Sequence, residues 1–347
     1  MSDIRFLFQN SMKAVYKFFS FVLVPFLLLS CRAITPDRYG EPSYTEILDE
    51  VWSTINDRYV NFCNKDIDWD EILTKYHKEI RDDMDHDEFM FTLAQMIESL
   101  QDMHLGITVS GTGWNLGYQP HIEGNYDSEI LSSILSGSKL AGGLWYTILP
   151  KTNIGYIYYG SFELEVSEEN LCEVFDSFQN CDGIVFDIRA NPGGKQSNLI
   201  SILKFLPCNG EPIFNIYTRK ECDRNSLKFR EVVTCPSCNV QPYDKPFIIL
   251  IGGKSYSASS LFALVASQCR NVSLVGSPTS GGTCAPEPVE LSNGWICNIP
   301  TVKIMSIKNV DCENGVTPDY EVMLDSICVK NGIDNIIQFS CDLIASQ

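Results

Sequence analysis

The sequence predicts an α/β protein in which a small helical domain precedes an α/β core. Two observations support this fold class. From residue 151 onward, short apolar runs typical of buried strands alternate with amphipathic stretches typical of helices, as expected for a parallel sheet with helical crossovers. Between residues 44 and 104, apolar residues instead recur every three or four positions, which indicates helices alone. A chain of 347 residues is long enough for both parts.

The first 30 residues have the features of a signal peptide. Two lysines precede an apolar run of about 12 residues, which suits a signal peptide but is too short to span a bilayer core of roughly 30 Å. The sequence Leu-Leu-Ser-Cys at 28–31 resembles a bacterial lipobox, whose cysteine carries the lipid. We therefore expect residues 1–30 to be a lipoprotein signal peptide and Cys31 to anchor an exported protein in the cell envelope, periplasmic or surface. The alternative is a buried N-terminal helix with an incidental cysteine.

A linker and three helices are expected next. Residues 31–43 contain two prolines and a glycine and are typical of a linker. In the helical domain, 44–104, Asp68 and Asp85 stand where helix N-caps are expected, each with a glutamate three residues later as in a capping box. The expected helices cover residues 44–60, 69–80 and 86–100.

The α/β core is expected at 151–347, with an insert at 208–245 that could form a lid. Residues 105–150 are rich in Gly, Ser and Asn, and we expect an irregular connecting segment there. The expected core strands cover 154–159, 183–188, 246–252 and 272–275, and the expected helices cover 167–179, 196–206 and 257–268.

Charge and cysteine content limit the classes of partner. The formal net charge is −18 and no compact basic patch is present, so nucleic acid is not an expected partner. Fourteen cysteines are present, and those other than Cys31 are odd in number, so they cannot all pair internally. Cys235 and Cys238 form a single C-x-x-C, whereas finger-type zinc sites draw on two such pairs, and we expect no metal. For this pair a disulfide, a metal clip and buried thiols remain open, and a structural role is favoured over redox catalysis.

Ser257 is the first residue that could carry chemistry. It follows the buried-strand run 246–252 and opens an apolar helix, so its hydroxyl would lie where free N–H groups stabilise a developing oxyanion. The alternative is an ordinary N-cap, for which serine is a common choice.

A second candidate is the turn Asp-Ile-Arg-Ala-Asn-Pro-Gly-Gly at 187–194, which ends another strand. Its two glycines would let the backbone approach a ligand and direct N–H groups into a cleft. The alternative is a tight turn closed by a salt bridge between Asp187 and Arg189.

His104 is the best candidate for a general base. Of the other histidines, His77 and His86 lie in charged helical stretches, and His121 lies in the segment without a clear prediction. A carboxylate ahead of a glycine turn, Glu313, could orient an imidazole, although such residues are more often exposed in loops.

Together these segments resemble the C-terminal processing (tail-specific) serine peptidases, and more closely the branch of the tricorn core protease and interphotoreceptor retinoid-binding protein. Residues 100–104, Leu-Gln-Asp-Met-His, are similar to the family's L-x-D-G-H, and 187–194 to its D-x-R-x-N-x-G-G. Further similar segments are 67–69, 155–157, 161–162, 255–259, 275–276, 279–282 and 313–319. The resemblance implies a crotonase-like α/β core and a serine endopeptidase that acts through an acyl-enzyme.

The resemblance also assigns roles. It implies Ser257 as nucleophile, His104 as base and Glu313 as the group that stabilises the imidazolium, directly or through a bridge. The oxyanion hole would be formed by N–H groups of Gly193 or Gly194 and of Ala258. A peptide or protein would be the substrate and no cofactor is needed.

Two positions depart from the family. The lysine of its Ser-Lys dyad corresponds here to Gly282, which disfavours that mechanism, and neither Lys254 nor Lys195 matches it. Met103 stands where a small residue is usual, and a thioether donates no hydrogen bond that could link Glu313 to His104. No PDZ module is evident at 105–150.

Two other functional classes remain. One is a catalytically inactive peptide- or ligand-binding lipoprotein on the same scaffold, motivated by Met103 and Gly282. The other is a glycan-binding surface lipoprotein, suggested by Trp114, Trp145 and Trp295.

Overall fold

The computed structural model describes residues 42–347 except 209, 222 and 238. The expected signal peptide, the lipidated Cys31 and nearly all of the linker lie outside the described residues. Within the described part, no helix has the length and apolar character needed to cross a membrane.

Three helices open the described chain and agree with the sequence periodicity. Asp68 caps the second helix by accepting hydrogen bonds from two backbone N–H groups of its first turn, and Asp85 caps the third in the same way with one. A reciprocal capping box forms instead at the first helix, between Ser43 and Glu46. The helices are α2 (Tyr44–Arg58), α3 (Trp69–Glu79) and α4 (His86–Glu98), with a 3-10 turn η1 (Phe62–Asn64) after α2.

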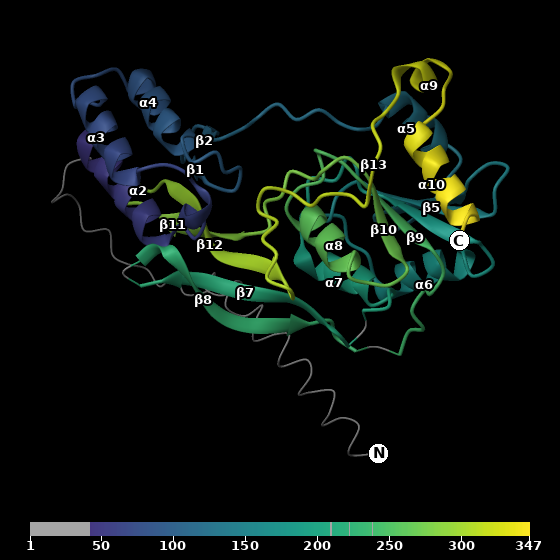
Figure 1. Ribbon diagram of the computed structural model, residues 1–347. Coiled ribbons are helices and arrows are strands. Elements are labelled where there is room, and N and C mark those ends of the chain that lie inside the picture. Colours follow the sequence, from purple (N-terminus) through teal and green to yellow (C-terminus); the bar gives the residue numbers. More distant parts are fainter. Residues whose placement is uncertain (1–41, 209, 222, 238) are drawn as a thin grey trace. The chain divides into compact units, whose positions relative to one another are not determined.

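The helices pack against strands from distant parts of the chain, not against each other alone. Their apolar faces share one core with strand residues such as Ile107 and Ile299. These strands form a sheet in the order β2-β1-β12-β7-β8, in which β11 also pairs with β12, and all pairs are antiparallel (Figure 1). The strands are β1 (Gly106–Thr108), β2 (Asn115–Gly117), β7 (Pro212–Lys220), β8 (Asp223–Thr234), β11 (Ala285–Glu290) and β12 (Ile296–Ser306).

This sheet corrects two expectations. Residues 208–245 do not form a separate lid: their long hairpin, β7–β8, extends the sheet. Residues 105–150 are not irregular throughout, because they contribute β1, β2, a helix and two further strands. Several of these strands have only three residues, too few to show an alternating pattern in the sequence.

The α/β core contains a second sheet in the order β13-β10-β9-β6-β5-β4-β3 (Figure 1). Its central strands β10, β9, β6 and β5 are parallel, and β4 and β3 continue it antiparallel. The strands are β3 (Lys139–Ala141), β4 (Leu144–Ile148), β5 (Ile154–Tyr159), β6 (Gly183–Asp187), β9 (Phe247–Ile251), β10 (Val272–Gly276) and β13 (Tyr320–Glu321).

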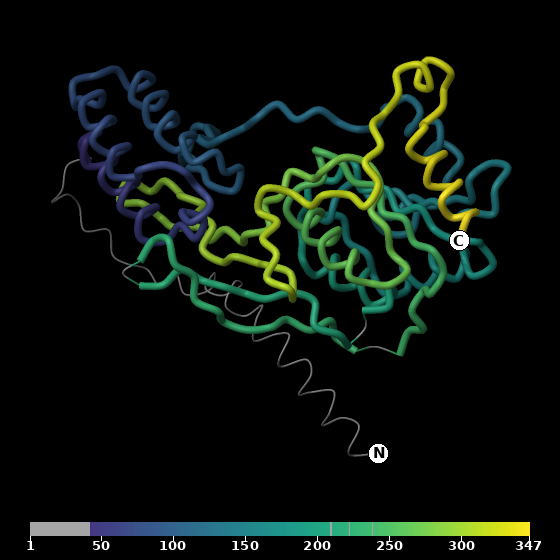
Figure 2. Tube along the Cα trace, in the orientation of Figure 1, coloured from purple at the N-terminus to yellow at the C-terminus, as the bar shows by residue number. Residues whose placement is uncertain are grey.

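Helices cover both faces of this sheet, as its largely buried central strands require. One apolar core joins it to α6, α7 and α8, and a smaller core on the other face joins it to α5 and α10. Figure 2 shows the chain reaching α5 from β2 through an extended connection. The helices are α5 (Ser128–Leu135), α6 (Glu168–Ser177), α7 (Gln196–Leu203), α8 (Ala258–Ala266), α9 (Ser326–Lys330) and α10 (Asn335–Ala345).

The pairing of β6 with β9 positions the two glycine- and serine-bearing turns. These strands are parallel neighbours, with Asp187 opposite Leu250. Their carboxyl ends therefore meet at one edge of the sheet, where sites in open α/β sheets form. The turn 187–194 and the turn that carries Ser257 leave the sheet side by side.

Candidate active site

Ser257 lies in a strained backbone conformation at the start of α8. Its φ is 56° and its ψ is −121°, a combination that non-glycine residues rarely adopt and that typically costs about 1–3 kcal/mol. It occupies the N-cap position, but its side chain makes no capping hydrogen bond. Ser257 N donates a hydrogen bond to the Gly281 carbonyl oxygen (2.8 Å), which helps to hold the turn. The hydroxyl is thus not used to cap the helix.

The hydroxyl instead faces His104. Nε2 of His104 lies 3.1 Å from Oγ of Ser257, which is hydrogen-bonding distance. His104 follows α4 and precedes β1, so the contact joins residues 153 positions apart. Burial lowers the pKa of His104 and the charge of Asp102 opposes this. The imidazole is therefore neutral at pH 7, the form that can accept a proton.

Asp102 is a buried carboxylate that binds the backbone N–H of His104. It accepts hydrogen bonds from His104 N (2.9 Å), Tyr59 Oη (2.8 Å) and Asn61 Nδ2 (3.4 Å). The motif at 100–104 contains this aspartate, but the sequence alone assigned it no role. Its position two residues before the expected base was the available signal.

Glu313 makes no hydrogen bond with His104 among the described residues, so of the two links expected, direct or through a bridge, the direct one is absent. Its carboxylate accepts from Cys284 N (3.2 Å) and Thr283 Oγ1 (3.5 Å). His104 Nδ1 is buried without a hydrogen-bond partner among the described residues. Glu313 and Asp102 line the same polar cavity of about 290 Å³, together with Met103. Burial, followed by the charge of Asp102, raises the pKa of Glu313 to about 7.

A buried polar network lies behind Glu313. Lys303 Nζ donates to Asn61 Oδ1 (3.0 Å) and is 2.7 Å from the Asp311 carboxylate. The Cys284 thiol donates to the same Asn61 oxygen at 3.2 Å. Asn61 therefore bridges the surroundings of Asp102 and Glu313. None of these neighbours of the site was distinguishable in the sequence, because they come from segments far apart in the chain.

Lys254 and Lys195, neither of which matches the dyad lysine, contact residues other than Ser257. Lys254 Nζ lies over the ring of Tyr126, 5.5 Å from its centroid, and Lys195 Nζ is 3.5 Å from Glu165. A Ser-Lys pairing is not present among the described residues. Of the remaining histidines, His77 is exposed and 2.7 Å from Asp49, as its charged surroundings predicted.

The glycine turn packs directly on the nucleophile turn. A Cβ at Gly193, whose φ is +100°, would lie 2.8 Å from the Ser257 Cβ, so only glycine fits there. The N–H of Gly193 donates to Asn191 Oδ1 at 2.9 Å, which favours Gly194 of the two glycines expected as oxyanion donors. Among described residues, the N–H groups of Gly194 and Ala258 have no acceptor and remain available.

A buried ion pair anchors the glycine turn. Arg189 Nη2 lies 2.6 Å from Asp187 and 2.9 Å from Asp334, and Nη1 donates to the Asn125 carbonyl at 3.1 Å. Asp187 also accepts from Tyr156 Oη at 2.8 Å. The salt bridge considered as an alternative to a functional turn is thus present, and it fixes the end of β6 beside Ser257.

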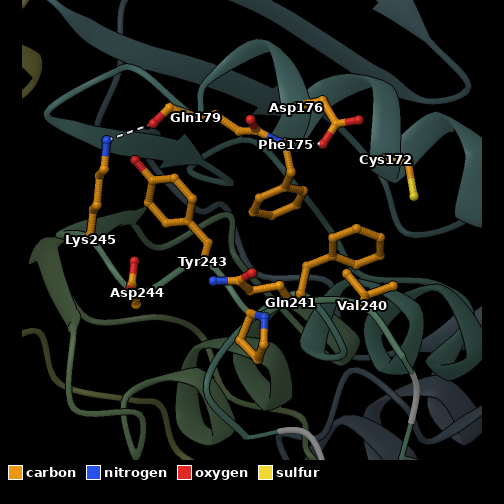
Figure 3. Close-up of a pocket in the computed structure, with 11 residues that line it drawn as sticks. Cys172, Phe175, Asp176, Gln179, Val240, Gln241, Tyr243, Asp244 and Lys245 are labelled. Carbon is orange, nitrogen blue, oxygen red and sulfur yellow. Dashed lines mark hydrogen bonds between the residues drawn. The ribbon is translucent and has the colours of Figure 1, made fainter.

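Another cavity, of about 380 Å³, contains none of the expected catalytic residues (Figure 3). It lies between α6 and residues 240–245, and Lys245 Nζ donates to the Gln179 carbonyl across its edge at 2.6 Å. Its lining includes Cys172, Asp176 and Lys245. The tryptophans proposed for glycan binding do not form one surface either, since Trp295 is buried in the core beneath the helices.

Comparison with known proteins finds similarity to processing peptidases. The family model "Peptidase family S41" matches residues 153–322, and the tricorn protease C1 domain model matches 41–98. The carboxy-terminal processing protease CtpA of Bacillus subtilis is 24% identical over 160 residues, 46% of this chain and 32% of that protein. The chloroplastic carboxyl-terminal-processing peptidase 2 of Arabidopsis thaliana is 25% identical over 170 residues, 48% of this chain and 31% of that protein. The chain thus spans about a third of the length of these curated relatives.

A solved structure agrees over nearly the whole described chain. A Parabacteroides merdae protein classed as a peptidase superposes with a TM-score of 0.82 at 28% identity, covering 87% of this chain and 97% of that one. The tricorn protease superposes with a TM-score of 0.52 at 15% identity over 88% of this chain and 37% of that one, a likeness of fold. The expected α/β fold class is confirmed. Residues 153–322 therefore form a peptidase family S41 domain, the family that the motifs of the sequence indicated.

Proposed function

We propose that this chain is a serine endopeptidase that hydrolyses peptide bonds through an acyl-enzyme on Ser257. The observation that carries the proposal is the 3.1 Å contact between a strained serine hydroxyl and a histidine that burial keeps neutral. An active serine needs such a base within hydrogen-bond reach. The family membership and the names of the relatives support the same reaction class.

In this mechanism, His104 Nε2 takes the proton of Ser257 Oγ as the oxygen attacks the peptide carbonyl. The resulting imidazolium then donates that proton to the leaving amine, and a water molecule releases the acyl group by the reverse sequence. The N–H groups of Gly194 and Ala258 would stabilise the oxyanion, each donor typically contributing about 3 kcal/mol. No cofactor enters the reaction.

The carboxylate whose charge acts on the base is Asp102, and Glu313 has no such effect on His104. Asp102 raises the pKa of His104, and so it favours the imidazolium that forms during catalysis. Glu313, with its raised pKa and no contact with the ring, is a weaker electrostatic partner. We therefore assign Asp102 the stabilising role and regard Glu313 as part of the polar cavity behind it.

We further propose export and membrane anchoring through lipid on Cys31, with a peptide or protein as substrate. The signal-like residues 1–30 and the lipobox motivate this. Expression in a bacterium with labelled palmitate tests it. Incorporation in the wild type that is lost in Cys31→Ala, but kept in Cys63→Ala, is the expected result, and equal labelling of both variants would refute the anchor.

Fluorophosphonate labelling tests the catalytic proposal. The wild type is expected to be labelled and to cleave a denatured protein substrate, whereas Ser257→Ala and His104→Ala lose both properties. Ser267→Ala is the matched control, because Ser267 is exposed at the opposite end of α8. A folded wild type that is neither labelled nor active, yet binds peptide, would favour the inactive binding protein. The orphaned Nδ1 of His104 and Met103 motivate that alternative.

A further inference from the structure

Three buried cysteines meet at the end of the core opposite to the catalytic turns. Cys208 follows α7, Cys235 follows β8 and Cys269 follows α8, and their exposed fractions are 6%, 0% and 5%. All three belong to one apolar core and are free thiols in the structure. The proposed catalytic mechanism uses none of them.

Backbone contacts bring these residues together. Cys235 N donates to the Glu211 carbonyl at 2.9 Å and its carbonyl accepts from Gly210 N at 3.1 Å, close to Cys208 in sequence. The side chain of Gln268, next to Cys269, donates to the Ile213 carbonyl at 3.2 Å. The Cys208 thiol donates its hydrogen bond to the Leu203 carbonyl at 3.3 Å, and the thiols of Cys235 and Cys269 are its neighbours.

Neither a metal site nor simple packing accounts well for this cluster. Among described residues, no group of three or more possible ligands has the arrangement needed for a metal ion. Packing accounts for one buried thiol, because cysteine behaves as a small hydrophobe, but not for three thiols that converge on one another. Convergent thiols in an exported protein are typical of disulfide formation.

We propose that Cys208 and Cys235 form a disulfide and that Cys269 is a third thiol able to exchange with it. The oxidising environment follows from the export proposed above, and the bond itself does not depend on peptidase activity. In the first step, the Cys235 thiolate attacks a low-molecular-weight disulfide and releases one thiolate from it. Cys208 then loses its proton and attacks the Cys235 sulfur of this mixed disulfide, which releases the second small thiolate. Two protein thiols are thereby oxidised to a disulfide, while the small disulfide is reduced to two thiols.

Exchange within the cluster needs no further oxidant. The Cys269 thiolate attacks the Cys208 sulfur, a Cys208–Cys269 bond forms, and Cys235 leaves as thiolate. The interaction with Cys208 lowers the pKa of the Cys235 and Cys269 thiols and raises that of Cys208, so Cys235 and Cys269 are the thiols that form thiolates first. Because all three are buried, we expect oxidation to occur while the chain folds, before this core closes.

The bond would stabilise the scaffold that supports the catalytic turns. The Cys208–Cys235 link closes the base of the β7–β8 hairpin, whereas the Cys208–Cys269 link joins the far ends of α7 and α8. These two helices begin at the glycine turn 187–194 and at Ser257. A cross-link that closes the loop from Cys208 to Cys235 is expected to raise the melting temperature by several degrees, roughly 5–10 °C.

Peptide mapping tests the proposal. The full chain is unfolded in urea, refolded with reduced and oxidised glutathione, alkylated without reduction and digested with trypsin. Cys208, Cys235 and Cys269 then lie in separate peptides, 205–219, 231–254 and 255–270. Because Cys238 shares a peptide with Cys235, the map is repeated with Cys238→Ser. The expected result is a 205–219 peptide linked to 231–254 that persists in Cys238→Ser.

Variants and an independent readout complete the test. Cys235→Ser is expected to redirect the link to 255–270, and Cys341→Ser, remote on α10, leaves the original link unchanged. Dithiothreitol is expected to lower the melting temperature of the wild type by several degrees. Complete alkylation of Cys208 in folded wild type, or its linkage to a peptide carrying neither Cys235 nor Cys269, would overturn the proposal. Neither readout measures catalysis, so the disulfide can be confirmed or refuted even if the protein has no peptidase activity.

Discussion

The ring of Tyr256 lies directly over Gly282. A Cβ atom at position 282, where φ is +67°, would come within 2.1 Å of the Tyr256 ring. The same ring lies 4.7 Å from the His104 ring, centroid to centroid, at an angle of 42°. Tyr256 therefore fills the space that a lysine side chain at 282 would need. Gly282 thus leaves room for the Tyr256 ring, which packs against the histidine base.

This packing predicts strong coupling between the two positions. Gly282→Ala is expected to destabilise the protein by about 1–3 kcal/mol, because it adds a clash to a strained φ. Tyr256→Ala alone is expected to reduce the rate of peptide cleavage by loosening His104. In Gly282→Ala/Tyr256→Ala the clash is absent, so the double variant should lose less unfolding free energy than the sum of the two single losses. Urea denaturation of the four proteins measures this, and simple additivity would show that the ring is free to move aside.

Asp102→Asn is expected to lower kcat/KM by about 100-fold or more, because the imidazolium loses its nearest negative charge. Asp102 raises the pKa of His104, so its removal should lower that pKa further. The acid limb of the kcat/KM profile should then move to lower pH. A purely structural role would reduce the rate without this shift. Asp57→Asn, exposed on α2, is the control and should leave the profile unchanged.

Glu313→Gln should change how stability depends on pH. The carboxyl of Glu313 titrates at about 7 in the folded protein against an ordinary value of 4.5, so the folded state holds its proton more tightly. The tighter proton binding adds at most on the order of 3 kcal/mol to the free energy of unfolding. This contribution is fully present below pH 4.5 and is lost as pH rises through 7.

Relative to wild type, Glu313→Gln should therefore become more stable as pH rises from 4.5 to above 7. Urea denaturation at pH 5 and pH 8 gives the comparison, with the exposed Glu287→Gln as control. An equal stability difference at both pH values would contradict the raised pKa.

Arg189→Met should lower the free energy of unfolding by about 3–5 kcal/mol, because Asp187 and Asp334 would be left buried without their cation. Arg270→Met, at an exposed position, should change stability by less than about 0.5 kcal/mol. Chemical denaturation measures both. A small effect of Arg189→Met would mean that water reaches the two carboxylates when the arginine is removed.

Elements whose signal is local were predictable from the sequence. The helices α2, α3 and α4 follow from apolar residues repeating every three or four positions, and the central strands from apolar runs beside glycine-rich turns. The turn 187–194 and Ser257 could be located because strand, turn and helix succeed one another in a short stretch. Parallel neighbours must place such turns together, so their proximity was also predictable.

The sequence by itself thus determined the order of the elements, the family and the pair His104 and Ser257 as candidates. Only the tertiary structure decided that the β7–β8 hairpin joins the sheet of β12, that Gly193 N–H is bound to Asn191, and that Glu313 faces Cys284 and not His104. The physical reason is that periodicity reports which face of an element is buried. The direction of a side chain or N–H group depends instead on packing partners that lie far away in the chain.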